Sequence, residues 1–301
     1  MNKSRHIERL LAALACTMIL LAPRAGAQSD LQKTLEQFNS NDVKGYIQPM
    51  GDLFGANMNG GLFHSAEIAK TGFHFSFELV GMAAMVGDAQ KTYTLNTPAG
   101  FNPSSFKTAT MFGGPADSVT DPVKHVTLRG IADGFVNTSV FPLAAPQITI
   151  GDVFGTRAII RYIAVPSMQG FPGLSLWGIG VQHSVNQWVP VIPLDVAGHI
   201  YYSKFSLGDL VNFNGLAIGV DASKSFSVLR LYGGLQWEKA SMELKYTPTD
   251  ATVPPVDLTL DGANSFRATL GLCLHLGFFS VFADANFGSI TNYTGGIGFG
   301  D

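Results

Sequence analysis

Residues 265–276 read SFRATLGLCLHL and change in character at every position. Six apolar side chains, from Phe266 to Leu276, occupy alternate positions, and smaller or polar residues such as Arg267 lie between them. Successive side chains of a β-strand point to opposite faces. The stretch therefore predicts a strand with one wholly apolar face.

Other segments repeat this alternation and are about as long as a strand that crosses a bilayer, which needs roughly 9–11 residues against about 5–6 in soluble proteins. The clearest are 73–79, 157–162, 227–238, 241–246 and 278–287. Tight connections alternate with long polar ones at 96–123 and 247–263. Short periplasmic turns and longer outer loops are typical of outer-membrane barrels. We therefore expect an all-β protein, an antiparallel transmembrane β-barrel.

Counting back from the last segment predicts about 14 strands (12–14), with both termini in the periplasm. The segments are 290–299, 278–287, 264–276, 241–247, 226–238, 213–223, 195–205, 174–184, 154–165, 135–141, 124–131, 89–95, 73–85 and 62–69. Residues 62–301 would form the barrel domain.

Residues 1–27 have the layout of a Sec-type signal peptide, cleaved after Ala27. A basic start precedes an apolar run from Leu10 to Ala22, and small residues precede the cleavage site. A membrane anchor is the alternative, but a spanning helix needs about 20 apolar residues. Lipidation at Cys16 is another, although the residues before it fit a lipobox poorly. We expect export to the cell outer membrane.

The amino-acid composition limits which partners and which classes of protein fit this chain. The signal removes four of 19 basic and one of 22 acidic residues, which leaves the mature chain at a net charge of −6 and argues against nucleic acid as a partner. Only Cys273 remains after cleavage, so no intrachain disulfide can form. Charged residues are 14% of the chain, against roughly 25% in soluble domains.

Residues 28–61 do not follow the strand pattern. A helical stripe covers 29–44, and five glycines and Pro49 then predict turns over 45–61. Such a segment can lie in a barrel lumen or in the periplasm, but cannot face lipid. We expect 45–61 to lie inside the barrel as a plug, with candidate contacts at Tyr46, Gln48, Pro49, Asp52, Phe54, Asn57 and Asn59.

Six stretches carry a resemblance to a known family: GYIQPMGD at 45–52, FGAN at 54–57, NGGL at 59–62, FGTR at 154–157, WGIGVQH at 177–183 and ASKSF at 222–226. Over most of the mature chain the sequence resembles a family of uncharacterised bacterial outer-membrane proteins, regarded as barrels of unknown function. More distantly, the layout resembles the long-chain fatty-acid transporters, 14-stranded barrels whose N-terminal segment plugs the lumen. The Asn-Pro-Ala triplet of that second family is absent.

The polar faces of the predicted strands supply candidates for the lumen. They are His74, Glu78, Arg129, Arg157, Arg161, Arg230, Glu238, Arg267, His275 and Asp284. Ion pairs that brace the barrel interior are one interpretation, and a polar pathway or binding pocket is the other.

No catalytic or metal motif stands out. His183 and Ser184 are adjacent, so on a strand they face opposite sides, and the remaining histidines are dispersed. We expect no enzyme, no cofactor and no metal, but a channel or transporter for a small-molecule solute. A structural or surface-attachment barrel and a soluble periplasmic β-sandwich that binds a ligand are the alternatives. Expected partners are outer-membrane lipid and the barrel-assembly machinery. That machinery recognises an aromatic residue at the end of a barrel chain, whereas here Phe299 is third from the end and Gly300 and Asp301 follow it.

Overall fold

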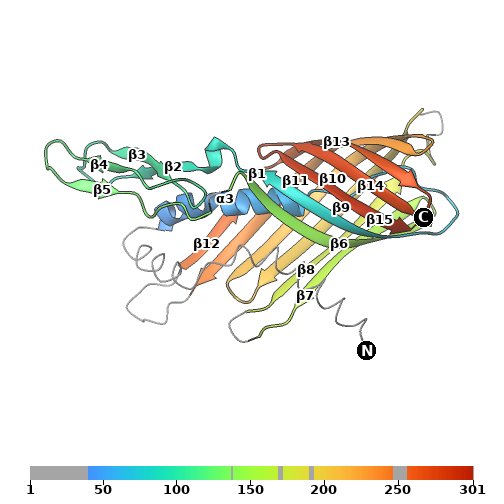
Figure 1. The fold of residues 1–301 in the computed structure, drawn as a ribbon, viewed down its shortest axis with the longest axis horizontal. Coiled ribbons are helices and arrows are strands. Elements are labelled where there is room, and N and C mark those ends of the chain that lie inside the picture. The colour runs from blue at the N-terminus through green and yellow to red at the C-terminus, as the bar shows by residue number, and fades with distance from the viewer. Residues whose placement is uncertain (1–39, 137, 169–171, 190–192, 247–255, 301) are drawn as a thin grey trace. The chain divides into compact units, whose positions relative to one another are not determined.

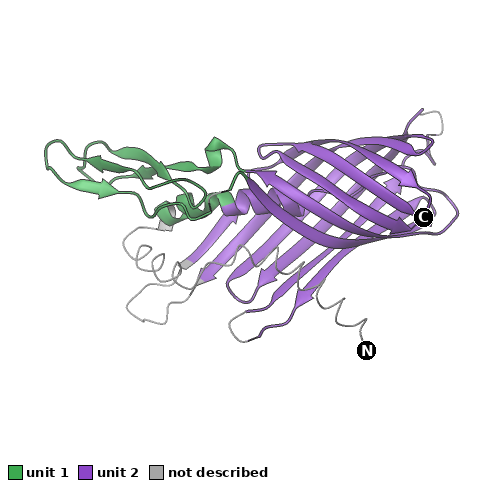
Figure 2. Cartoon of the chain, viewed as in Figure 1, with its two compact units in different colours: residues 1–49, 86–139, 250–254 green, residues 50–85, 140–249, 255–301 purple. Residues whose placement is uncertain are grey.

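The computed structural model describes residues 40–136, 138–168, 172–189, 193–246 and 256–300. The predicted signal peptide and most of the predicted helix at 29–44 lie outside these residues. The chain divides into two compact units, one of residues 1–49, 86–139 and 250–254, the other of 50–85, 140–249 and 255–301 (Figure 2).

Within the described residues, ten antiparallel strands of the second unit form a closed ring (Figure 1). Each strand pairs with the next, β10 also pairs with β11, and β1 pairs with β15, so the ring has no free edge among them. The prediction of an antiparallel barrel is confirmed. The strands are β1 (His74–Met85), β6 (Val140–Val153), β7 (Thr156–Val165), β8 (Leu174–Ser184), β9 (Asp195–Leu207), β10 (Val211–Phe226), β11 (Leu229–Tyr246), β13 (Phe266–Leu276), β14 (Phe279–Phe287) and β15 (Asn292–Gly300).

The predicted number of 14 strands is wrong. Segments 226–238 and 241–247 are one strand, β11, without a turn at Lys239. Segment 62–69 is no strand, and segments 89–95 and 124–131 belong to two small sheets of the other unit, so the ring has ten strands. Segment 135–141 was placed too early, because β6 begins at Val140 and runs through Pro142 and Pro146.

One further strand lies outside the ring. β12 (Val256–Asp261) pairs with residues 241–246 of β11, beyond the stretch 229–237 where β13 pairs with the same edge. The great length of β11, 18 residues, makes room for both partners.

The outward faces of all ten strands are apolar. In register, Ile148, Ile160 and Ile179 are direct neighbours on β6, β7 and β8, and each is exposed. On β13, Leu272 is 45% exposed whereas its neighbour Cys273 is 3% exposed. Exposed apolar side chains on the ten strands in order include Phe77, Ile148, Ile160, Ile179, Ile200, Ile218, Leu235, Leu272, Val281 and Ile297.

The two ends of the ring differ. At one end, which we call the turn end, β1 begins, β15 ends, and tight turns join β6 to β7, β10 to β11 and β13 to β14. Ser227 and Gly277 have positive φ there, as such turns require. At the other, the insert end, residues 86–139 are inserted between β1 and β6.

The insert belongs to the first unit and forms two small sheets after the 3₁₀ turn Asp88–Gln90. β2 (Thr92–Asn96) pairs with β3 (Ser105–Ala109), and β4 (Ser118–Thr120) pairs with β5 (Thr127–Arg129). The hydroxyl of Tyr46 donates a hydrogen bond to the backbone oxygen of Asp133 at 2.8 Å. Burial, and then the charge of Asp133, raise the pKa of Tyr46.

The helix α3 (Ser40–Met58) covers the stretch that the glycines and Pro49 predicted as turns, and that prediction is wrong. Two glycines one helical turn apart explain the difference. A Cβ on Gly51 would lie 2.9 Å from the Cβ of Leu260, and one on Gly55 would lie 2.7 Å from the Cβ of Ala240. The glycines therefore let the helix approach the strands closely. None of the helices among the described residues combines the length and the apolar character that crossing a membrane requires.

Candidate functional site

Residues 50–69, which we call the lumen segment, run inside the ring from the insert end to the turn end. Gly51 lies against Leu260 of β12, beside the far end of β11. At the other end, the amide of Ala66 donates to Ser223 Oγ at 3.0 Å, and the oxygen of Lys70 accepts from the amide of Phe154 in the β6–β7 turn. The segment therefore passes through the whole barrel.

Towards the insert end the interior is an apolar core. The ring of Phe54 lies 4.9 Å, centroid to centroid, from the rings of both Phe205 and Phe213. Leu53 and Leu260 are fully buried beside them. The helical part of the lumen segment thus fills this half of the barrel with packed side chains.

Midway along the barrel, Arg161 of β7 holds the backbone of the lumen segment. It is 1% exposed, and its Nη2 donates to the carbonyl oxygen of Gly60 at 2.9 Å and to that of Gly61. Its Nη1 donates to the oxygen of Met58 at 3.4 Å, and its Nε to Gln147 Oε1 at 2.8 Å. One buried guanidinium therefore satisfies carbonyl groups that the irregular backbone would otherwise leave unpaired.

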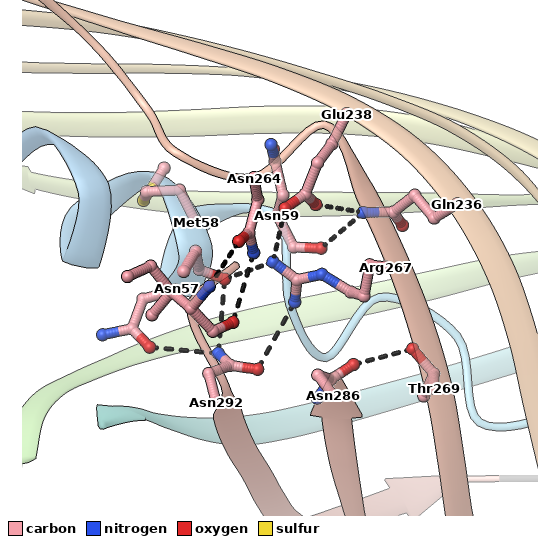
Figure 3. A network of polar contacts seen from close by, with 12 residues as sticks. Asn57, Met58, Asn59, Gln236, Glu238, Asn264, Arg267, Thr269, Asn286 and Asn292 are labelled. Carbon is pink, nitrogen blue, oxygen red and sulfur yellow. Dashed lines mark hydrogen bonds and ion pairs between the residues drawn. The ribbon is translucent and has the colours of Figure 1, made fainter. Parts of the chain in front are cut away.

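A second set of contacts holds the end of the helix (Figure 3). Arg267 Nη2 donates to the oxygen of Ala56 at 2.6 Å and to Glu238 Oε1 at 3.0 Å. Glu238 also accepts from Gln236, whose Nε2 lies 3.2 Å from the oxygen of Asn59. The carboxylate orients both donors, so the ion pair and the backbone contacts form one unit.

Asn57 joins the helix end to two other strands. Its Nδ2 donates to the oxygen of Phe141 at 2.7 Å, and its Oδ1 accepts from Asn292 Nδ2 at 3.1 Å. The side chain is fully buried.

Towards the turn end the barrel contains a cavity of about 350 Å³. Leu62, Phe63 and His64 of the lumen segment line it, together with wall residues such as Glu78 and Phe282. The lumen is thus hollow at the turn end and filled from the level of Gly60 to the insert end.

Two ion pairs lie at this cavity. Arg157 Nη2 lies 2.7 Å from Asp152 Oδ1, and Arg230 Nη2 lies 3.1 Å from Glu67 Oε2. Arg157 also donates to the oxygen of Glu67 at 3.0 Å, so both arginines contact the end of the lumen segment.

A buried histidine–carboxylate pair lies on β9 and β10, between the strands that carry the two arginines. His199 Nδ1 is 2.7 Å from Asp221 Oδ2, and its Nε2 is 3.2 Å from Gln236 Oε1. Gln182 donates to the same carboxylate at 2.8 Å. Among the described residues, no group of three or more His, Cys, Asp or Glu side chains is placed to hold a metal ion.

Nine of the ten lumen candidates belong to barrel strands. Glu238 and Arg267 meet directly, Asp284 accepts from Tyr232 at 2.8 Å, and His74 and His275 line the cavity. Glu78, Arg157, Arg161 and Arg230 have been placed above. Arg129 is the exception: it lies on β5 of the insert, exposed, and pairs with Asp133 at 2.6 Å, because segment 124–131 is not a barrel strand.

The plug candidates divide between the two units. Tyr46, Gln48 and Pro49 lie in the first unit, and Asp52, Phe54, Asn57 and Asn59 lie in the lumen segment. Asn59 is 1% exposed, and its side-chain amide has no hydrogen-bond partner among the described residues.

Sequence reasoning missed several residues of these contacts, above all Gln147, His64 and His199. Gln147 lies in a stretch that two prolines made unlike a strand, and His64 in a segment predicted as wall. His199 shares its strand face with Ala197 and Tyr201, so the period-two pattern of 195–205 could have found it.

A family model described as "Family of unknown function (DUF6588)" matches residues 1–300. The chain belongs to this family. Among solved structures, the chain is similar to Ail, the attachment invasion locus protein of Yersinia pestis, at 10% identity and a TM-score of 0.29, over 76% of this chain and 99% of that one. It is also similar to a loop-deletion mutant of OmpT, an outer membrane protein of Vibrio cholerae (9%, TM-score 0.27, 76% and 99%), and to a FadL homologue of Pseudomonas aeruginosa (9%, TM-score 0.20, 85% and 96%). These scores are low, and the barrel is established by the strand pairing of the chain itself.

Proposed function

We propose that this chain is a β-barrel of a bacterial outer membrane that carries a small polar solute, and that the lumen segment closes the pathway. The observation that carries the proposal is a ring with an apolar exterior whose interior holds a segment of the same chain beside a polar cavity.

The exterior supports the membrane location. Soluble proteins rarely expose apolar patches of more than a few hundred Å², whereas here exposed apolar side chains occur on all ten strands. Strands of 9–18 residues are long enough to cross a bilayer. Lipid would be the partner of this surface, and the assembly machinery would insert a barrel whose last strand exposes Phe299. Cleavage after Ala27 remains part of the proposal.

The interior supports passage of a solute. Beyond the apolar contacts of its helical part, the lumen segment is held by hydrogen bonds from wall side chains to its backbone oxygens, and water can replace these bonds if the segment moves. The wall strands pair with one another and do not depend on the segment for their backbone hydrogen bonds. No catalysis and no nucleic acid are part of this proposal.

The test is a reversible lock on the lumen segment. Ala66→Cys with Ser223→Cys, in a Cys273→Ala background, puts two thiols on neighbouring residues, since the Ala66 amide and Ser223 Oγ lie 3.0 Å apart. The full chain, folded into liposomes, should pass small polar solutes when reduced and stop when oxidised. Ala66→Cys alone is the control, and its flux should not respond to oxidant.

The structural or surface-attachment role predicts a different result. A barrel without transport should show no flux with the lock open or closed, and none after Arg161→Met, while its heat-modifiable migration on gels remains. The β-sandwich alternative does not fit a closed ring of ten strands.

A further inference from the structure

The cavity at the turn end carries an imbalance of charge. Four carboxylates line it, Glu67, Glu78, Asp152 and Asp195, against two arginines, Arg157 and Arg230. Both arginines are already paired, with Asp152 and Glu67. Among the residues that the structure describes, neither Glu78 nor Asp195 has an arginine or lysine nitrogen within 4 Å.

Glu78 lies deep in this cavity and has only neutral hydrogen-bond donors. The carboxylate accepts from Gln147 Nε2 at 2.7 Å and from Ser76 Oγ at 3.1 Å, and the residue is 9% exposed. The nearest group that can carry a positive charge is His64, whose Nε2 lies 3.6 Å away, and a buried carboxylate without a close cation is costly. The site therefore favours an incoming positive charge.

His64 is a second and independent indication of a ligand. It is 9% exposed, it lines the cavity, and neither ring nitrogen has a hydrogen-bond partner among the described residues. Its Nε2 lies 3.6 Å from Glu78 Oε2, too far for a hydrogen bond. A group with several N–H donors placed beside the pair would satisfy the carboxylate and an imidazole nitrogen together.

The part of the cavity around His64 also offers apolar contacts. The ring of His64 stacks on Phe282 at 3.5 Å between centroids, and Leu62 and Phe63 lie beside them. Methylene groups can pack on this surface, and a cation is attracted to the face of an aromatic ring. Asp195, half-buried on β9, provides the other unpaired carboxylate of the cavity.

We propose that the cavity at the turn end binds a small organic amine, with one ammonium group at Glu78 and His64 and a second, in a diamine, directed to Asp195. The inference rests on the proposed function, since it names the class of solute that the pathway takes.

Calorimetric titration of the full chain in detergent tests the class of ligand. Diaminobutane is the probe, and butanediol and succinate are its neutral and anionic counterparts of similar length. Diaminobutane should bind, and the other two should bind at least about tenfold more weakly, because only the amine offsets the surplus carboxylates. Equal binding of butanediol, or preferred binding of succinate, would overturn the proposal.

Two variants place the binding at this cavity. Glu78→Gln keeps the shape of the side chain and should weaken diaminobutane binding at least about tenfold. Asp195→Asn, at a less buried position, should weaken it several-fold and carries the test if Glu78→Gln does not assemble. Glu243→Gln is the matched control, since Glu243 is exposed near the insert end and pairs with Lys245. Unchanged affinity in both cavity variants would overturn the inference.

Binding and transport can fail separately. Amine binding without flux in liposomes would support this site and contradict transport. Flux of neutral solutes without amine binding would support transport and contradict this site.

Discussion

The guanidinium of Arg161 and the carbonyl oxygen of Gly60 lie 2.9 Å apart, although 101 positions separate the two residues in the sequence. Arg161→Met removes this bond and leaves buried oxygens of Met58 and Gly60 without a donor. Each buried group left unpaired costs about 1–3 kcal/mol, so the free energy of unfolding should fall by at least about 2 kcal/mol. Guanidinium unfolding of the lipid-inserted barrel measures this. Arg129→Met, which breaks only an exposed pair with Asp133, should cost no more than about 1 kcal/mol; equal losses would contradict the anchoring role of Arg161.

A charged side chain introduced on the outward face of the barrel tests whether that face contacts lipid or water. Leu272→Arg should destabilise the barrel by about 2–4 kcal/mol if the residue lies near the bilayer midplane. Val123→Arg is the matched control, because Val123 is an apolar residue that is 78% exposed in the insert. That change should stay within about 0.5 kcal/mol. A Leu272→Arg barrel as stable as the control would mean that this face does not contact lipid.

The backbone of the lumen segment depends on Gly61. Its φ is +61°, and a Cβ would lie 2.7 Å from Val80 Cγ1. Gly61→Ala should therefore cost more than about 1 kcal/mol and loosen the segment, raising the basal leak of solutes from liposomes. Gly114→Ala has no atom within 4 Å of the new Cβ and should leave the leak unchanged. A leak that does not respond to Gly61→Ala would argue that the segment is not the barrier.

Single cysteines test which end of the barrel faces the cell exterior. Val123→Cys in the insert should react with an impermeant maleimide on intact cells, since long connections face outward in outer-membrane barrels. Phe278→Cys, in the exposed β13–β14 turn, should react only after permeabilisation. The reverse pattern would invert the proposed orientation and open the cavity to the exterior.

Asp121 organises a loop of the insert. Its carboxylate accepts hydrogen bonds from the backbone amides of Lys124, Asn102 and Val123 at 2.8–2.9 Å, and these hold its pKa below the usual value. Because the folded pKa is lowered, the contribution is complete above the unfolded value of about 3.9 and is lost as pH falls through the folded one. Asp121→Ala should lower the hydrogen-exchange protection factors of residues 100–128 at neutral pH, and acidification below about pH 4 should lower them in the unmodified chain, each measured against the intrinsic rate at that pH. Exchange that is insensitive to both changes would contradict this role.

The strands could be predicted wherever one face is apolar and exposed along its whole length and the other face is polar. Residues 265–276 were predicted almost to the residue as β13, because one face contacts solvent or lipid throughout and the other faces a polar interior. The alternation of 278–287 gave β14 in the same way.

The prediction failed where packing against the lumen segment makes the barrel interior apolar instead of polar. Along β11, Gln236 and Glu238 face inward, and so do Ala240 and Met242, which pack in the apolar half of the barrel. The period-two pattern instead places Met242 on the apolar face of a separate segment and so predicts a tight turn at Lys239 and Ala240. The pattern of a single strand does not reveal what lies behind it.

The contacts of the site were predictable in part. Arg161, Glu238 and Arg267 were found from strand faces alone, because a charge on an inward face needs a partner. The two arginines donate to backbone oxygens of a segment about 100 to 200 positions away, and Glu238 accepts from Arg267. No local sequence pattern predicts those contacts. Contacts between a strand and an irregular segment do not repeat at a fixed interval, so a periodicity in the sequence cannot reveal them.

The passage of the lumen segment through the ring sets the order in which the protein can assemble. Threading residues 50–69 through a ring that is already complete would require the chain that precedes them to pass through the lumen first. We therefore expect these residues to lie along the nascent wall before β1 and β15 meet. That last pairing joins residues as far apart as Ser76 and Gly300, and such distant contacts form slowly. Until then the sheet is not closed, and the lumen segment provides the surface against which the inward-facing side chains of the strands pack.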